Sequence, residues 1–202
     1  MFRKSVYPKI EPRLNEIAKK LHTRGITPHQ LTLAGLALSF LAGCVYATGL
    51  FFMGAVVLLI ACLGDMLDGP LARVGKTAST FGAFFDSTLD RYSDFFVFGG
   101  LVLFFARQNQ GLWLLVSLGI LAGSFITSYA KARAEALIGR CPVGVFERSE
   151  RIGFLVLGSL VWPLMPLCLW ILLIGTNGTA IQRILYVWKE SPSPSPSEFS
   201  AE

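Results

Sequence analysis

Hydrophobic residues gather in six long segments along the chain. These segments cover residues 28–49, 51–72, 82–106, 111–134, 150–165 and 167–188. A helix needs about 20 mostly apolar residues to cross the hydrocarbon core of a bilayer. The whole chain is 53% hydrophobic and only 15% charged. The pattern therefore predicts an all-α, polytopic membrane protein with six transmembrane helices.

Two sequence features mark helix ends. Thr27 followed by Pro28 suits the start of the first helix, with the hydroxyl at the N-cap and proline at the first helical position. Pro163 and Pro166 lie between the fifth and sixth segments. They either turn the chain between two helices or kink one long helix.

Lysine and arginine follow the positive-inside rule. With six spans and both ends in the cytoplasm, 16 of the 18 basic residues lie inside, Arg107 lies outside, and Arg91 falls within the third helix. One long fifth helix would move Arg183 and Lys189 outside, so the charges favour a turn. The sequence predicts a multi-pass protein of the cell (inner) membrane, with the charged ends of its helices in the cytoplasm.

The chain divides into three predicted parts. Residues 1–25 are basic, and the apolar positions among residues 5–22 predict an amphipathic helix on the inner leaflet. A plain basic arm is the alternative, because two prolines weaken the first turns. Residues 26–190 form the transmembrane domain, and residues 191–202 form a Ser/Pro-rich, disordered tail. No cleavage site follows a short apolar core, so we expect no removable signal peptide.

Four carboxylates interrupt the second and third apolar segments. Asp65 and Asp68 are three residues apart, and Asp86 and Asp90 are four apart, so each pair projects from one face of its helix. Ionised side chains at membrane depth cost at least roughly 2.5 kcal/mol each, so the group requires a cation, a water-filled cavity, or both. Oxygen ligands without His or Cys suit Mg²⁺, Mn²⁺ or Ca²⁺. The array predicts a divalent-cation site near the cytoplasmic face.

The spacing of this array resembles the signature of the CDP-alcohol phosphotransferase family at every fixed position. With x for any residue, the match is Asp65-x2-Asp68-Gly69-x2-Ala72-Arg73-x8-Gly82-x3-Asp86-x3-Asp90. The resemblance implies a six-helix transferase in which an alcohol attacks the β-phosphorus of a CDP-linked donor and releases CMP. It also implies a homodimer.

The resemblance implies a role for each matching residue. Asp65, Asp68 and Asp86 would bind two Mg²⁺ or Mn²⁺ ions, and Asp90 would join the second ion and act as the catalytic base. We expect Asp94 to form a salt bridge or support its neighbours. Single small residues in membrane helices are usually packing residues, but their joint spacing here favours a nucleotide and donor site. Its candidate residues are Asp68, Gly69, Ala72, Arg73, Ser79, Thr80 and Gly82.

A basic cluster on the cytoplasmic side indicates a phosphorylated acceptor. Forked guanidinium groups match phosphate oxygens, although positive-inside charges that touch lipid headgroups are the alternative. Residues 128–135, 147–151 and 182–183 resemble the corresponding stretches of bacterial phosphatidylinositol phosphate synthases. That resemblance implies inositol 1-phosphate as the acceptor. It places the acceptor phosphate on Lys131, Arg151 and Arg183, with Arg133 and Arg148 as further candidates.

Other features limit the choice of substrates. Ser87 and Arg91 stand where glycerol-phosphate enzymes of the family usually have Pro and Lys. Residues 74–80 replace the Gly-rich basic loop of the inositol-phosphate enzymes. We expect a CDP-diacylglycerol-type donor, with glycerol 3-phosphate or L-serine as alternative acceptors, and no nucleic-acid partner. A divalent-cation transporter is the alternative of another class, but the basic cluster beside the array would repel a cation.

Overall fold

The described part of the protein is entirely helical. The computed structural model describes residues 7–191, with side chains placed from residue 11 onward. Its elements are α2 (Tyr7–Thr23), α3 (Pro28–Ala47), α4 (Phe51–Val74), α5 (Thr80–Arg107), α6 (Gly111–Ile138), α7 (Arg148–Leu160), the short 3₁₀ helix η1 (Trp162–Leu164) and α8 (Met165–Glu190). The all-α prediction is confirmed for these residues. Most of the predicted disordered tail, residues 192–202, lies outside them, as do residues 1–6.

Four stretches of helix are long and apolar enough to cross a membrane, against the six expected. These are α3, α4, α6 and the continuous stretch of η1 and α8 from residue 162 to 190. α5 is 28 residues long but carries Asp86, Asp90, Arg91 and Asp94. α7 has only 13 residues. Length and composition thus support a multi-pass membrane protein without establishing the six-span count.

The helix ends follow from local sequence. Thr27 caps α3 as expected, because its hydroxyl accepts a hydrogen bond from the Gln30 backbone nitrogen (3.3 Å). The Gln30 side chain accepts one from the Thr27 nitrogen in return (3.0 Å), which completes a capping box. The chain turns at Pro163, since α7 and α8 are separate helices that pack against each other. The turn between the fifth and sixth segments is therefore confirmed.

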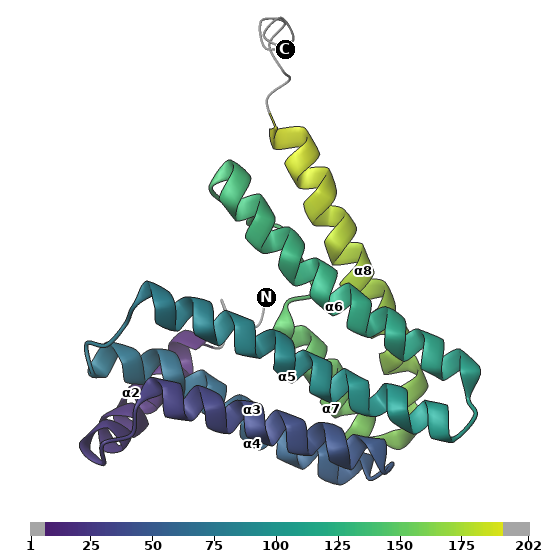
Figure 1. The fold of residues 1–202 in the computed structure, drawn as a ribbon, viewed down its shortest axis with the longest axis horizontal. Coiled ribbons are helices and arrows are strands. Elements are labelled where there is room, and N and C mark those ends of the chain that lie inside the picture. Colours follow the sequence, from purple (N-terminus) through teal and green to yellow (C-terminus); the bar gives the residue numbers. More distant parts are fainter. Residues whose placement is uncertain (1–6, 192–202) are drawn as a thin grey trace, which may run out of the picture.

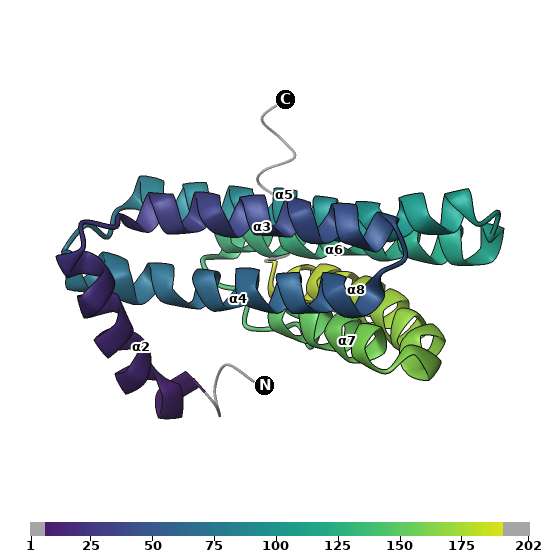
Figure 2. The ribbon, with the colours of Figure 1, turned by 90° about the horizontal axis from the view of Figure 1, so that it is seen from below.

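α3 is the helix against which the first half of the molecule assembles. It packs on both α4 and α5, and the three lie side by side in Figures 1 and 2. Gly43 and Gly100 allow the close crossing of α3 and α5: a Cβ on Gly43 would collide with the Phe96 backbone, and a Cβ on Gly100 with the Gly43 backbone. The two helices therefore meet backbone to backbone.

The second half is built around α6 and α8. α6 packs on α5 and α8, and α7 packs on α4 and α8. Figure 1 shows the later halves of α6 and α8 pointing away from α3, α4 and α5. α2 packs on α4, with Leu14 and Ala18 buried. Residues 7–23 thus form a helix with one face covered by protein, and its position on the inner leaflet stays a prediction.

Candidate active site

The carboxylates lie where α4 ends and α5 begins. α4 and α5 follow each other in the chain, and both pack against α3. The short connection of residues 75–79 joins them, so Asp65 and Asp68 near one end of α4 come level with Asp86 and Asp90 near the start of α5. This is the arrangement that the spacing of the signature predicts.

Asp68 and Asp86 meet across the two helices. Their carboxylates are close enough for hydrogen bonding when one of them carries a proton. Asp68 Oδ1 accepts a hydrogen bond from the Gly69 nitrogen (2.5 Å). Asp68 Oδ2 is buried and has no hydrogen-bond partner among the described residues. Two adjacent carboxylates with a buried, unpartnered oxygen form a site that a cation would stabilise.

Asp65 and Asp90 meet through a cation of the protein itself. The Nη1 atom of Arg148 lies 2.8 Å from Asp65 Oδ2 and 2.5 Å from Asp90 Oδ1. Arg148 is the first residue of α7, so one guanidinium joins α4, α5 and α7. This position differs from the expected role of Arg148 beside an acceptor phosphate. Arg91 lies farther from Asp90, at 3.6 Å.

The carboxylates do not all converge on one point. Among the described residues, no group of three His, Cys, Asp or Glu side chains is arranged to hold a metal ion. Arg148 stands between Asp65 and Asp90, while Asp68 and Asp86 form a separate pair. The ligand types fit a hard divalent ion, and the unpartnered Asp68 oxygen leaves a coordination position open.

Asp94 forms a buried salt bridge, which is one of the two roles expected for it. Its side chain is 4% exposed, and its Oδ2 accepts a hydrogen bond from Arg151 Nη2 (2.6 Å). Its Oδ1 lies 3.7 Å from Arg148 Nε. Asp94 of α5 thus contacts two arginines that share one face of α7. These contacts connect the start of α7 to α5.

Gly35 is a residue of the site that sequence reasoning missed. A Cβ at this position on α3 would collide with Asp65 Oδ1. The Asp65 carboxylate therefore lies directly against the α3 backbone with one oxygen and reaches Arg148 with the other. A glycine in a membrane helix gives no sign of this role, because packing glycines are common there.

The predicted donor residues surround the turn between α4 and α5. A methyl group on Gly69 would meet only Arg73 Nη1, at 3.8 Å, so its surface is open. Arg73 pairs with Glu11 of α2 (3.5 Å). Ser79 caps α5 by accepting a hydrogen bond from the Gly82 nitrogen (3.0 Å). Ala72 is half-buried, and Thr80 is exposed at the first position of α5.

The predicted acceptor residues come from three helices. Lys131 of α6 pairs with Glu147 (3.3 Å). Arg183 of α8 is buried, and its guanidinium donates to the carbonyls of Val143 (3.1 Å) and Thr127 (2.6 Å). Arg183 lies within electrostatic range of both Glu147 and the buried Arg151, whereas Arg133 is exposed near the end of α6.

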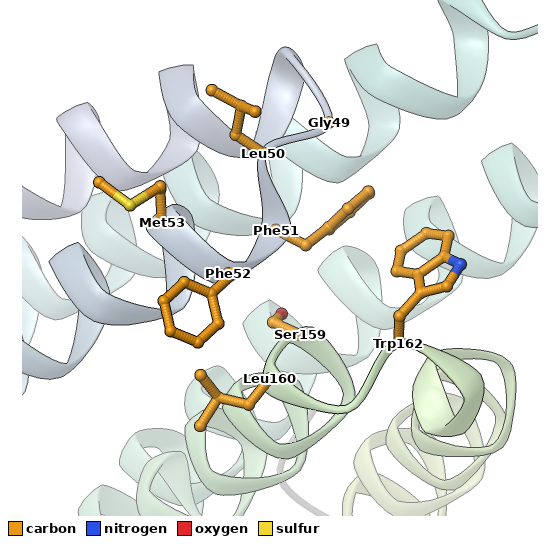
Figure 3. A pocket seen from close by; sticks show the side chains of 8 residues that line it. All are labelled: Gly49, Leu50, Phe51, Phe52, Met53, Ser159, Leu160 and Trp162. Atoms are coloured by element: carbon orange, nitrogen blue, oxygen red, sulfur yellow. The ribbon is translucent and has the colours of Figure 1, made fainter.

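One cavity lies away from the carboxylates. It has a volume of about 370 Å³ and is lined by residues 49–53, from the α3–α4 turn into the start of α4, and by Ser159, Leu160 and Trp162. In Figure 3 the Phe51 side chain points toward Trp162, and the two ring centroids are 4.5 Å apart. Phe51 to Met53 begin α4, whereas Asp65 and Asp68 lie toward its other end. This cavity is therefore not the candidate active site.

The geometry agrees with a known protein family. The family model described as CDP-alcohol phosphatidyltransferase matches residues 25–185. The chain belongs to this family. The match covers every carboxylate of the array and all predicted acceptor residues.

Two relatives show which members of the family this chain resembles. The chain is 37% identical over 195 residues to the phosphatidylinositol phosphate synthase of Streptomyces avermitilis, covering 88% of this chain and 79% of the relative. It is 37% identical over 158 residues to the archaetidylinositol phosphate synthase of Pyrococcus horikoshii, covering 77% and 80%. Both relatives have inositol phosphate in their names.

The fold matches solved structures of the Mycobacterium tuberculosis phosphatidylinositol phosphate synthase. The crystal structure with CDP-DAG bound superimposes with a TM-score of 0.82 at 33% identity, over 90% of this chain and 98% of that chain. The complex with manganese and citrate gives a TM-score of 0.81 at 33% identity, over 92% and 97%. The relative thus binds a CDP-linked lipid and a divalent metal, and nothing in the comparisons supports the cation-transporter alternative.

Proposed function

We propose that this protein is a membrane transferase that moves a phosphatidyl group from a CDP-diacylglycerol-type lipid to inositol 1-phosphate and releases CMP. The observation that carries the proposal is the pair formed by Asp68 and Asp86, with a buried carboxylate oxygen that lacks a partner in the described structure. This pair occurs at the family's spacing in a chain that belongs to the family.

Asp65, Asp68, Asp86 and Asp90 would hold two Mg²⁺ or Mn²⁺ ions. All four ligands are carboxylates, which suit hard divalent cations. Bound ions would neutralise diphosphate oxygens and the charge that develops on them. The open surface of Gly69, together with the small residues Ala72 and Gly82, would let the cytidine approach the backbone closely.

Asp90 would act as the general base. Its side chain is 21% exposed, so an acceptor hydroxyl can reach it. As the hydroxyl oxygen bonds to the β-phosphorus, its proton would pass to the Asp90 carboxylate. The bond between the β-phosphorus and the bridging oxygen breaks, and that oxygen leaves with CMP.

Arg151 and Arg183 would bind the acceptor phosphate, together with Lys131. Both of these Arg183 hydrogen bonds go to neutral carbonyl oxygens, so neither of them pairs its charge with a carboxylate. A phosphate placed between the two arginines would offset their mutual repulsion. The exposed Arg133 is a weaker candidate, and Arg148 would contact this phosphate only after it leaves Asp65 and Asp90.

The names of the relatives favour this acceptor. Phosphatidylinositol phosphate synthases and archaetidylinositol phosphate synthases share inositol phosphate and differ in the lipid. The part of the substrates common to both groups is therefore the acceptor. A CDP-linked diacyl lipid is our choice of donor, because CDP-DAG is bound in the crystal structure with the highest TM-score given above.

We infer a six-span topology with the site facing the cytoplasm. Residues 95–106 of α5 are apolar, and its carboxylates point toward partners on other helices rather than lipid. α7 rises by about 20 Å, and the chain turns directly after it, at η1. Residues 1–25 would be the interfacial segment and residues 26–190 the transmembrane catalytic domain. Two copies would form a homodimer.

A panel of acceptors tests this function. Purified protein is incubated with CDP-diacylglycerol, Mn²⁺ or Mg²⁺, and inositol 1-phosphate, inositol, glycerol 3-phosphate or L-serine, and the lipid product is identified by mass. We expect a product with inositol 1-phosphate that requires the divalent ion. Equal use of free inositol, or a product only with glycerol 3-phosphate or L-serine, would overturn the acceptor assignment.

A further inference from the structure

Arg148 occupies the place between two carboxylates that the proposed function gives to an ion. Its Nη1 contacts both Asp65 Oδ2 (2.8 Å) and Asp90 Oδ1 (2.5 Å). A single positive group thus compensates two carboxylates from facing helices, which would otherwise repel each other inside a membrane protein. An ion that uses these same oxygens must compete with the guanidinium for them.

The position of Arg148 in the chain allows an ion to replace its guanidinium at Asp65 and Asp90. Arg148 is the first residue of α7 and follows the irregular segment of residues 139–147. Asp94, fixed by its buried bond to Arg151, lies 3.7 Å from Arg148 Nε. The guanidinium therefore has a third carboxylate beside it, which is not among the proposed ion ligands. Arg148 can leave Asp65 and Asp90 while Asp94 still compensates its charge.

We propose that Arg148 is an internal counter-cation of the carboxylate array, which a divalent ion displaces from Asp65 and Asp90 when the active site is loaded. The inference rests on the proposed function, because it takes these two carboxylates to be ion ligands. It makes Arg148 a positioning residue: it keeps α4, α5 and α7 together before loading and lowers the affinity for the ion, both by competition and by charge repulsion.

The test measures the binding of Mn²⁺ to the full-length protein in nanodiscs. The free Mn²⁺ that remains is quantified by electron paramagnetic resonance. Arg148→Gln removes the competing charge, and we expect it to bind Mn²⁺ about 10-fold more tightly, or more, which is the scale of one charged hydrogen bond. Arg148→Lys keeps a positive charge but lacks the forked guanidinium. Its Mn²⁺ affinity should lie between those of the wild type and Arg148→Gln. Arg140→Gln, an exposed loop residue, is the matched control and should bind Mn²⁺ as the wild type does.

The same variants have a stability readout. Without divalent ions, Arg148→Gln should unfold at a lower temperature than Arg140→Gln, and Mn²⁺ should raise its unfolding temperature more than that of the wild type. A folded Arg148→Gln protein with unchanged or weaker Mn²⁺ affinity overturns the inference while leaving the proposed function intact. A wild type that binds no Mn²⁺ overturns the ion site itself.

A measurement on the wild type covers the case in which Arg148→Gln does not fold. If Mn²⁺ displaces Arg148, backbone hydrogen exchange at the start of α7 should become faster on Mn²⁺ addition, because the side-chain bonds that hold this end to α4 and α5 are lost. The end of α8 serves as the internal control and should not change. Slower exchange at the start of α7 would contradict displacement.

Discussion

Gly35 sets the position of the Asp65 carboxylate, and a single methyl group there tests that role. A Cβ on Gly35 would collide with Asp65 Oδ1. We expect Gly35→Ala to push this carboxylate toward Arg148 and to lower turnover by about 100-fold, since small displacements of catalytic groups have effects of this order. Helix content by circular dichroism should be unchanged, because alanine favours helix.

Gly64 provides the control for this substitution. It adjoins Asp65 on α4, and a Cβ there would meet only Leu31 Cδ1, at 3.9 Å. Gly64→Ala should retain wild-type turnover in the same CMP-release assay. If Gly35→Ala is as active as Gly64→Ala, the carboxylate does not depend on contact with α3.

Arg183 allows the acceptor assignment to be tested without breaking an ion pair. Its hydrogen bonds go to backbone carbonyls, whereas Arg151→Ala would remove the closer of the two arginine partners of the buried Asp94. We expect Arg183→Gln to raise the KM for inositol 1-phosphate by about 10- to 150-fold, the range for a lost charged hydrogen bond. The KM for CDP-diacylglycerol should change little. A similar rise in both would indicate that Arg183 supports the fold instead.

Single residues were predictable where sequence spacing determines them. Asp65 and Asp68 are three residues apart and Asp86 and Asp90 are four apart, so each pair shares one face of its helix. In the structure Asp68 and Asp86 lie close together across the two helices. The bonds from Arg148 to Asp65 and from Arg151 to Asp94 span 83 and 57 residues. Such contacts depend on helix packing, which periodicity does not encode, so Arg148 was placed at the acceptor instead of at the array.

At the scale of elements, the crossing of α3 and α5 depends on two glycines. Side chains on Gly43 or Gly100 would collide with backbone atoms of the facing helix. We expect Gly43→Ala to lower the unfolding free energy by about 1 to 3 kcal/mol, because the backbones must separate. Thermal unfolding in detergent measures this effect. Gly99→Ala, which adds a methyl group with nothing within 4 Å, should be neutral, and equal loss in both variants would contradict the close crossing.

The helix boundaries agree with the sequence where a local capping signal sets them. They differ from the apolar segments elsewhere. Thr27 and Pro28 begin α3 as predicted, since capping is local chemistry. The fifth segment was predicted to continue to residue 165, but α7 ends at Leu160, before Pro163. α6 continues to Ile138, four residues beyond its apolar segment, and ends at Gly139, which adopts the left-handed conformation. Hydrophobicity predicts where a helix meets lipid rather than where it ends.

At the scale of the whole molecule, the six-span topology is the open prediction. It places residues 75–79 and 139–147 inside and the turn at Arg107 outside. In a variant without its four natural cysteines, single cysteines at Lys76 and at Gln110 would be treated with a membrane-impermeant maleimide in intact cells. We expect labelling only of Gln110→Cys. Labelling of Lys76→Cys alone would reverse the orientation of the candidate active site.

The central claim is that the carboxylate array performs the transfer from a CDP-linked lipid. The most direct measurement is CMP release from CDP-diacylglycerol on addition of inositol 1-phosphate, compared among the wild type, Asp90→Asn and Glu16→Gln, an exposed carboxylate of α2. We predict acceptor-dependent release by the wild type and Glu16→Gln, and a loss of at least about 100-fold in a folded Asp90→Asn protein. CMP release that needs no acceptor, or that survives in Asp90→Asn, would contradict the account.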